Sequence, residues 1–243
     1  MSKEKDNLPE SWLKEEKLAP VENTTLTRSL ALLYHIFTEY FKLYIKSLRR
    51  QDSMSILESI SQRRTYYQIN KELPLDTGKV KEVIQQATEL VPDAFNMKSA
   101  RVVLALGQKQ DELWDAVYEA FGGKVPREKI DSFKAGAGTV LYFYDEDVVK
   151  SLQEQFALYA ANFPIWAQQA NGMLQFTIWT ALRDLNIGAS LQHYNPVIDE
   201  AVKKLFQVPD SWQLVAQMPF GGITAEPEAK EKEDISNRVK ICE

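Results

Sequence analysis

The chain has 243 residues, of which 44% are hydrophobic and 26% are charged, and its formal net charge is −5. These values describe a globular protein with a substantial core, and the acidic balance argues against a nucleic-acid-binding protein, which needs a basic surface. A single cysteine, Cys242, excludes an internal disulfide and is typical of a reducing compartment, so we expect a cytoplasmic protein.

The N-terminal fifth of the chain differs from the rest. Residues 1–29 are polar and charged, and the apolar segment Leu30 to Leu48 follows. Its length suits a membrane span, but it contains four ionisable residues that are costly in hydrocarbon: His35, Glu39, Lys42 and Lys46. We interpret it as an amphipathic helix that docks on protein, with contact to a membrane surface as the less favoured alternative. The sequence therefore predicts an N-terminal extension over residues 1–52, with a helix at about 30–48, and a domain over residues 53–243.

Helix and strand patterns alternate along the predicted domain. Ser55 and Glu58 have the spacing of a capping box, so a helix should begin there. A second helix follows Asp76 and ends before Pro92. The run 138–144 is apolar on both faces, which is typical of a central strand. We also expect a strand at 101–106, helices at 110–121, at 146–159 and from Pro196, and a last strand at 212–220 that Gly221 and Gly222 end. Helices outnumber strands, so the fold class is α+β or α/β.

The most apolar helix of the domain is expected at 164–184. It has apolar residues on nearly every side, as a helix inside a core does. Gly188 follows it and should permit a backbone turn that is closed to residues with a Cβ atom. We interpret residues 189–194 as a recognition loop that the helix delivers to a defined place. A core helix followed by a core strand is the plainer alternative.

Three polar clusters lie between these elements. Two arginines at the end of the first helix could bind a phosphate, because guanidinium groups form paired charge-assisted bonds to phosphate oxygens. An asparagine in the loop before the 101–106 strand could bond a sugar hydroxyl or cap its own turn. Lysines in the tail could add positive charge to a phosphate site. Each cluster could equally be solvated surface. The clusters contain these candidate residues: Arg63, Arg64, Thr65, Tyr67, Asn96, Lys98, Lys230 and Lys232.

Three motifs, taken in order and spacing, resemble the FMN-dependent nitroreductase family, and in particular its compact branch from fungi and lactic-acid-type bacteria. They are RRTYYQI at 63–69, FNMKSAR at 95–101 and GASLQHYNP at 188–196. The resemblance covers about residues 54–240. It implies an α+β fold with a mixed central β-sheet wrapped by helices. The 164–184 helix would then be the long central helix of a homodimer that builds two FMN sites.

The resemblance also implies roles for the candidate residues. Arg63 would bind the flavin phosphate, with Arg64, Thr65 and Tyr67 beside it and Lys230 and Lys232 adding positive charge. Asn96 would face the ribityl chain or the ring edge, from the same subunit or its partner. Lys98 lies in the same motif, where the family often has glutamine. The isoalloxazine ring would lie against four consecutive residues: Ser190, Leu191, Gln192 and His193.

The activity that the resemblance implies is that of an oxidoreductase. FMN would take hydride at N5 from NADH or NADPH and pass it to a nitroaromatic or a quinone, with ping-pong kinetics and no obligatory catalytic residue. The expected partners are a second copy of the chain and small aromatic electron acceptors, without nucleic acid. Two alternatives stay open: another flavin reaction on the same fold, or a non-catalytic protein that binds flavin or meets a partner through the 30–48 helix. No metal site is expected, because the two histidines and one cysteine form no ligand cluster.

Overall fold

The computed structural model of the chain describes residues 38, 55–231 and 233–243. All of these except Thr38 belong to one compact unit, Ser55–Glu243. The expected 30–48 helix, apart from Thr38, and Lys232 lie outside the described residues, and the division of the chain at residue 52 stays a prediction. None of the helices described is long and apolar enough to cross a membrane.

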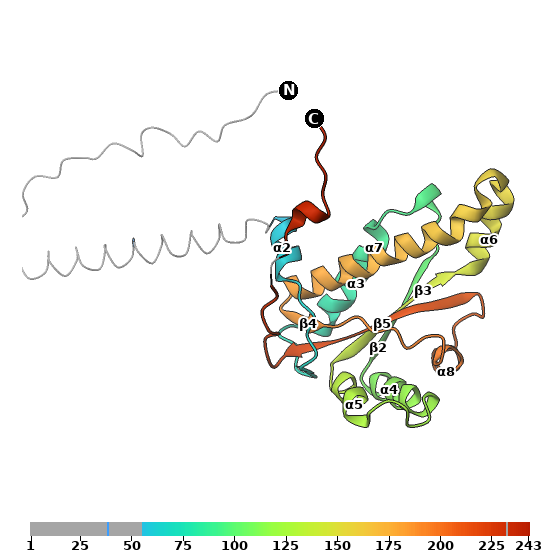
Figure 1. The fold of residues 1–243 in the computed structure, drawn as a ribbon. Helices are drawn as coiled ribbons and strands as arrows, with labels where there is room; N and C mark the ends of the chain where they lie inside the picture. The colour runs from blue at the N-terminus through green and yellow to red at the C-terminus, as the bar shows by residue number, and fades with distance from the viewer. Residues whose placement is uncertain (1–37, 39–54, 232) are drawn as a thin grey trace, which may run out of the picture. The chain divides into compact units, whose positions relative to one another are not determined.

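The described unit contains seven α-helices and five strands, labelled as in Figure 1. The helices are α2 (Ile56–Gln62), α3 (Thr77–Leu90), α4 (Gln108–Ala120), α5 (Arg127–Lys134), α6 (Glu146–Gln155), α7 (Phe163–Asp184) and α8 (Asp199–Phe206). The strands are β1 (Ile69–Asn70), β2 (Ala100–Leu106), β3 (Gly138–Asp145), β4 (Ile187–Ala189) and β5 (Trp212–Ile223). Three 3₁₀ turns complete it: η2 (Ala94–Asn96), η3 (Ala157–Asn162) and η4 (Ile235–Asn237). The α+β class is therefore confirmed.

The strands form a single sheet in the order β1-β5-β3-β2, and β4 also pairs with β5. The resemblance implies a mixed sheet, but every pairing among the described strands is antiparallel. The register gives the reason. Leu106 at the end of β2 pairs with Gly138 at the start of β3, and Asp145 at the end of β3 pairs with Trp212 at the start of β5. Each connection therefore returns the chain to the end of the sheet that it left, so the next strand runs in the opposite direction.

Helices cover both faces of the sheet, and β3 lies between two cores, as its apolar pattern predicts. Val140 and Tyr142 pack with α3, α7 and β4, whereas Leu141 and Phe143 pack with α4, α5 and α8. This division follows from the alternation of side chains along a strand. Figure 1 shows α3 and α7 on one side of the sheet and α4 and α5 on the other. The result is a three-layer arrangement with β3 and β5 at its centre.

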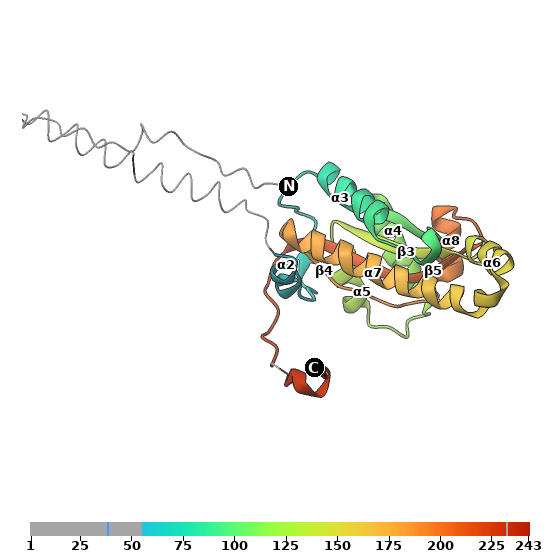
Figure 2. The ribbon, with the colours of Figure 1, turned by 90° about the horizontal axis from the view of Figure 1, so that it is seen from above.

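The long helix α7 crosses one face of the sheet (Figure 2) and is apolar on its outer side as well as its inner side. Leu174 and Ile178 are buried against the sheet, which accounts for the inner side. Ile165, Met173 and Phe176 are 55%, 45% and 41% exposed. The helix predicted at 164–184 is confirmed, and within the described part of a single chain its outer side stays partly exposed.

Two predicted turns at glycine are wrong, and close packing explains both. The left-handed turn after α7 is at Asn186, with φ 58°, whereas Gly188 lies inside β4. A Cβ atom on Gly188 would come within 2.9 Å of Tyr66 Cβ. Gly221 and Gly222 do not end β5, which continues to Ile223. Their Cβ atoms would lie 2.2 Å from the Asn70 carbonyl oxygen and 2.0 Å from that of Glu72, so the glycines allow β1 and the residues after it to lie against β5.

The predicted helix boundaries are confirmed where a cap defines them. The Ser55 hydroxyl accepts the Glu58 N–H at 3.2 Å, and the Asp76 carboxylate accepts the Gly78 N–H at 2.7 Å. The helix expected at 146–159 instead ends at Gln155, because Phe156 leaves helical geometry and joins a cluster of aromatic rings. The helix expected from Pro196 begins at Asp199, after a turn in which the Asp199 N–H donates to the Pro196 carbonyl.

Candidate functional site

The first motif begins where α2 ends, and its two arginines face different surroundings. The Arg63 guanidinium lies over the Trp179 ring, with 4.3 Å between the guanidinium carbon and the ring centroid, and 6.0 Å from the Phe176 centroid. This cation–π contact fixes the Arg63 side chain along the C-terminal half of α7. Arg64 instead donates from Nη2 to the carbonyl of Glu228 in the C-terminal tail.

Both arginines keep unused hydrogen-bonding capacity. Nε of Arg63 and Nε of Arg64 are buried and have no hydrogen-bond partner among the residues that the structure describes. Within the part of the chain that the structure describes, neither guanidinium has a carboxylate at ion-pair distance. Burial, and then the charge of Arg64, lowers the pKa of Arg63 from its usual value. Buried donors beside uncompensated positive charge make this a place where an anion would be stabilised.

Arg183 is a third arginine at this place, and sequence reasoning missed it. Its Nη1 donates to Asn186 Oδ1 at 3.0 Å, and its guanidinium carbon lies 5.7 Å from the Tyr66 ring centroid. Its Nε is buried and has no partner within residues 55–231 and 233–243. Arg183 follows Trp179 by one turn on α7, so the two side chains share a helix face. That spacing was the available signal, but the residue was interpreted only as part of the helix end.

Tyr66 joins the first motif to β4 and to the tail. Its backbone N–H donates to the Ala189 carbonyl at 3.0 Å, and its hydroxyl donates to Glu226 Oε2 at 2.9 Å. Burial, and the hydrogen bond to Glu226, raise the pKa of the Tyr66 hydroxyl. Among the other predicted residues of this cluster, Thr65 is half-buried, while Tyr67 and Lys230 are exposed.

The third motif runs antiparallel to β5 and leaves alternate backbone groups unpaired with it. The N–H groups of Ser190 and Gln192 donate to Pro219 and Gln217 carbonyls of β5, at 3.2 and 2.7 Å. Successive N–H groups point in opposite directions along an extended chain, so those of Leu191 and His193 point away from β5. The Ser190 and Gln192 side chains are buried and bonded to each other at 3.0 Å. These two buried side chains therefore support the segment from the inside of the protein, whereas His193 is exposed.

Gln217 on β5 holds the same segment, and no sequence pattern predicts this contact. The residue is fully buried, and its side-chain Oε1 accepts the Tyr194 N–H at 2.8 Å. Its backbone N–H and carbonyl both pair with Gln192. Tyr194 in turn packs edge-on against the Trp114 ring, with centroids 6.0 Å apart. Residues 190–194 are thus held by hydrogen bonds to β5 and by the packing of Tyr194 against aromatic rings.

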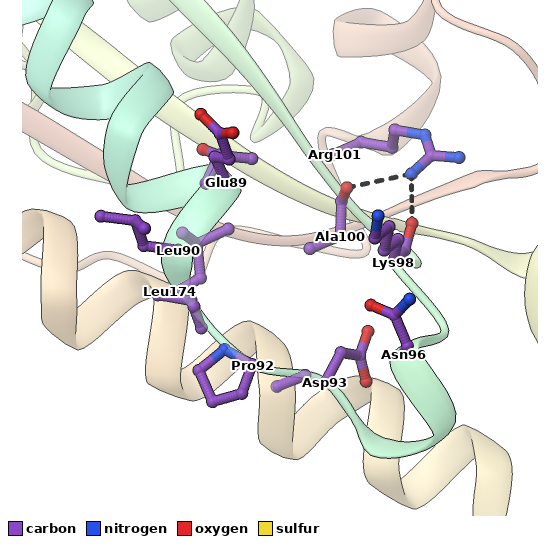
Figure 3. Close-up of a pocket in the computed structure, with 12 residues that line it drawn as sticks. Glu89, Leu90, Pro92, Asp93, Asn96, Lys98, Ala100, Arg101 and Leu174 are labelled. Atoms are coloured by element: carbon purple, nitrogen blue, oxygen red, sulfur yellow. Dashed lines mark hydrogen bonds between the residues drawn. The ribbon is translucent and has the colours of Figure 1, made fainter.

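The second motif lies at a pocket of about 470 Å³ between α3, β2 and α7 (Figure 3). Asn96 and Lys98 line it, and both side chains are exposed in the single chain. Asp93 Oδ1 is buried there and has no hydrogen-bond partner in the described part of the chain, and burial raises the pKa of that carboxyl. The remaining lining residues include polar and apolar side chains: Thr88, Glu89, Leu90, Val91, Pro92, Ala100, Arg101, Ala170 and Leu174.

A single chain does not bring this pocket and the arginines together. The pocket reaches Leu174, on the buried side of α7, whereas Arg63 contacts the ring of Phe176. Residues two apart on a helix point to opposite faces, so the two places lie on different sides of α7. The structure therefore brings the first and third motifs together through Tyr66 and Ala189, and leaves the second motif apart from them.

Comparison with known proteins gives one consistent result. The model of the Nitroreductase family matches residues 60–222. Nitroreductase FRM2 of Saccharomyces cerevisiae is 36% identical over 188 residues, which are 76% of this chain and 95% of that protein. The nitroreductase CinD of Lactococcus lactis, solved with chloramphenicol, is 44% identical with a TM-score of 0.75, over 78% of this chain and 100% of that one. CinD solved with 4-nitrophenol gives 43% identity and a TM-score of 0.72 over the same shares. The family-model match includes all three motifs. Together these matches establish that the chain belongs to the nitroreductase family.

Proposed function

We propose that the protein is an FMN-dependent reductase that uses NADH or NADPH to reduce nitroaromatic or quinone acceptors. When bound, the flavin supplies the redox chemistry, because its N5 atom accepts a hydride from the nicotinamide and passes it to the acceptor. The chain's own residues bind the flavin, orient its ring and leave a flat face open to two substrates in turn. No acid or base from the chain is required, and ping-pong kinetics follow.

The unpartnered donors of Arg63 and Arg64 are the observation that carries this proposal. A flavin phosphate carries nearly two negative charges at neutral pH, because its second pKa lies around 6. Arg63 is already fixed over the Trp179 ring and can offer a planar guanidinium to two phosphate oxygens. Arg64, Thr65 and Lys230 would complete the phosphate site, and Arg183 adds a third cation that the sequence interpretation omitted.

The third motif is suited to hold the flavin ring. The Leu191 and His193 N–H groups point away from β5, so they are the donors in this segment that can reach the ring edge. Ser190, Gln192 and Gln217 would position them from behind. Tyr67, exposed next to the phosphate-binding residues, would cover the ring or its ribityl chain. Preorganised donors of this kind favour negative charge that develops on a bound group.

The proposal requires two copies of the chain. The outer side of α7 exposes Ile165, Met173 and Phe176, and neighbouring α2 exposes Ile56 and Leu57. So much apolar surface around one helix is typical of an interface between subunits. Asn96 and Lys98 lie on the other side of α7 from Arg63, so we infer that a second copy supplies them to each flavin.

The acceptor class and the location follow from two further considerations. CinD binds chloramphenicol and 4-nitrophenol in its structures, and both molecules carry a nitroaryl group. We infer that this chain accepts molecules of the same class. The nicotinamide substrates and the single cysteine favour the cytoplasm as the compartment.

Flavin content and acceptor turnover test the proposed function. We expect the purified full-length protein to be yellow, to release about one FMN per chain on denaturation, and to oxidise NADH or NADPH when 4-nitrophenol or a quinone is added. Absorbance at the flavin bands measures the FMN content, and the change in absorbance at the nicotinamide band measures the oxidation of NADH or NADPH. A colourless protein that does not take up FMN would instead support the alternative of a non-catalytic protein that meets a partner through the 30–48 helix. A yellow protein without turnover of any acceptor would support another flavin reaction.

The homodimer is tested by charge on the outer side of α7. Interface anchors cost about 2 kcal/mol or more each when they are lost, so the double substitution Met173→Glu with Phe176→Glu should give monomers. Light scattering should give about twice the chain mass for the native protein and one chain mass for the variant. Val197, which is 50% exposed beside α8, provides the control, since Val197→Glu should stay dimeric. A native protein that is monomeric with FMN bound would contradict the shared site.

A further inference from the structure

The loop from Asp93 to Ser99 has an unusual backbone for the residues it contains. Phe95, Asn96 and Lys98 all have left-handed conformations, with φ of 56°, 52° and 52°. Asparagine tolerates this region, but a bulky aromatic residue seldom adopts it. Such strain persists only where the surroundings impose it, and it concentrates at functional positions. The contacts that impose it can be identified residue by residue.

Asp93 closes the loop at its base. Its Oδ2 accepts the Ser99 N–H at 3.3 Å and the Ser99 hydroxyl at 3.4 Å, so the two ends of the loop are bonded through one carboxylate. Ser99 is fully buried, and the Asn96 N–H donates to the Asp93 carbonyl at 3.0 Å. Met97, between the two exposed residues Asn96 and Lys98, is buried in a small core with Val149 and Phe163.

Arg101 holds the loop from the β2 side. Its Nη1 donates to the Lys98 carbonyl at 2.7 Å and to the Ala100 carbonyl at 3.1 Å (Figure 3), and its Nη2 donates to Asp145 Oδ2 at 3.0 Å. The Asp145 N–H completes the ring of contacts by donating to the Ser99 carbonyl at 2.8 Å. The Arg101 and Asp145 side chains are 29% and 14% exposed, so this ion pair is largely shielded from solvent.

The Phe95 ring is fixed on the opposite side. It lies 5.0 to 5.8 Å, centroid to centroid, from four rings: Phe156, Tyr159, Phe163 and Trp166. Asp93 therefore holds the start of the loop, Arg101 holds its end, and the aromatic rings hold Phe95 between them. Asn96, next to Phe95, and Lys98 are polar side chains of the loop that these contacts leave exposed.

We propose that Asp93 and Arg101 are positioning residues that hold residues 94–98 in a strained conformation, so that Asn96 meets the flavin in a fixed geometry. This inference rests on the proposed function, because it assigns Asn96 to the flavin. Neither Asp93 nor Arg101 contacts the flavin in this scheme. Both act through Asn96, by removing the freedom that it would otherwise lose when the flavin binds.

A double-mutant cycle on the full chain distinguishes this role from a merely structural one. FMN affinity is measured by fluorescence quenching on flavin-free protein that far-UV circular dichroism shows to be folded. We expect Asp93→Ala and Asn96→Ala each to weaken FMN binding about tenfold, the size of one lost hydrogen bond. The double variant should bind FMN about as weakly as Asn96→Ala alone, because the Asn96 side chain that Asp93 positions is already absent.

Conservative variants complete the test. Asp93→Asn keeps an oxygen that accepts from Ser99 and should bind FMN within about twofold of the native protein. Arg101→Lys keeps the charge but cannot bond the Lys98 carbonyl and Asp145 together, so it should lose about three- to tenfold. It also serves if Asp93→Ala does not fold. Asp111→Ala, which removes a surface partner of Lys71, is the matched control and should bind normally.

The outcomes separate the two proposals. Native protein that binds FMN together with unchanged affinity in Asp93→Ala and Arg101→Lys would overturn the positioning role alone. Losses that multiply to about a hundredfold in the double variant would do the same, since Asp93 would then act independently of Asn96. A native protein that does not quench FMN would overturn the proposed function, and the role of the loop with it.

Discussion

Arg63→Ala is expected to weaken FMN binding by about 30- to 1000-fold, so the variant should be largely colourless after purification. Removing a partly buried partner of a charged group costs roughly 2–4 kcal/mol, which corresponds to that range. Two features of Arg63 place it at the high end. Its guanidinium is already oriented by the Trp179 ring, and none of the described residues accepts a hydrogen bond from its buried Nε. Titration of folded, flavin-free protein with FMN, followed by fluorescence quenching, measures the change.

Three further variants make the Arg63 result specific. Arg63→Lys keeps the charge but loses the planar pair of donors, so its affinity should lie between native and Arg63→Ala. Lys230→Ala removes an exposed point charge and should lose less than Arg63→Ala. Arg127 pairs with Asp115 and Asp131 on the surface, so Arg127→Ala should leave FMN affinity unchanged. If Arg63→Ala and Arg127→Ala bind FMN equally well, the phosphate site is elsewhere.

Trp114→Ala is expected to lower the free energy of unfolding by about 3–5 kcal/mol, the usual cost of removing a buried tryptophan. Trp114 is fully buried between α4 and the sheet, and its ring packs against Phe133 at 4.9 Å between centroids. Its Nε1–H donates to the Thr139 hydroxyl at 2.9 Å, and that hydroxyl donates to Gln110 Oε1 at 2.6 Å. The substitution therefore opens a cavity and also leaves a buried polar chain incomplete.

Chemical unfolding followed by circular dichroism measures this effect. Excess FMN and a fixed protein concentration are needed in every sample, because ligand binding and association both add to apparent stability. Trp114→Phe keeps most of the packing but removes the N–H donor, so it should lose roughly 1–3 kcal/mol. Leu158 is 85% exposed, and Leu158→Ala should stay within about 0.5 kcal/mol of native. A Trp114→Ala midpoint equal to that of Leu158→Ala would show that this core tolerates the loss.

The sequence predicted those parts of the fold that local chemistry determines. Ser55 and Asp76 define helix starts through their own side chains, so the cap pattern was sufficient. β3 was recognisable because a strand buried on both faces needs apolar residues at every position. The prediction that Gly221 and Gly222 end β5 was wrong because their role is not determined locally. Their role depends on the carbonyls of Asn70 and Glu72, which lie about 150 residues away in the sequence, and no local pattern records such an approach.

The candidate site divides in the same way. Arg63 and Arg64 were predicted because two guanidinium groups at a helix end can bind a phosphate, and the motifs supplied the rest of the assignment. Arg183 and Gln217 were not predicted, since each contacts the motif residues only through the tertiary fold. The assignment of residues 190–193 to the flavin face stays a prediction, but the structure distinguishes alternate residues of that segment, because the side chains of Ser190 and Gln192 are buried and that of His193 is exposed. The parity of a strand is set by its neighbour β5, not by its own composition.

The position of β5 in the chain has a consequence for biosynthesis. Three of the four strand pairings of the described sheet, those of β1, β3 and β4, involve β5, which begins only at Trp212. A nascent chain that has not reached this strand can form the β2–β3 pair, but it leaves the other edge of β3 open. An unpaired, apolar edge invites pairing with other chains. Ribosomes that stall before residue 212 should therefore release products that aggregate or require chaperones, although by then the chain already contains all three motifs.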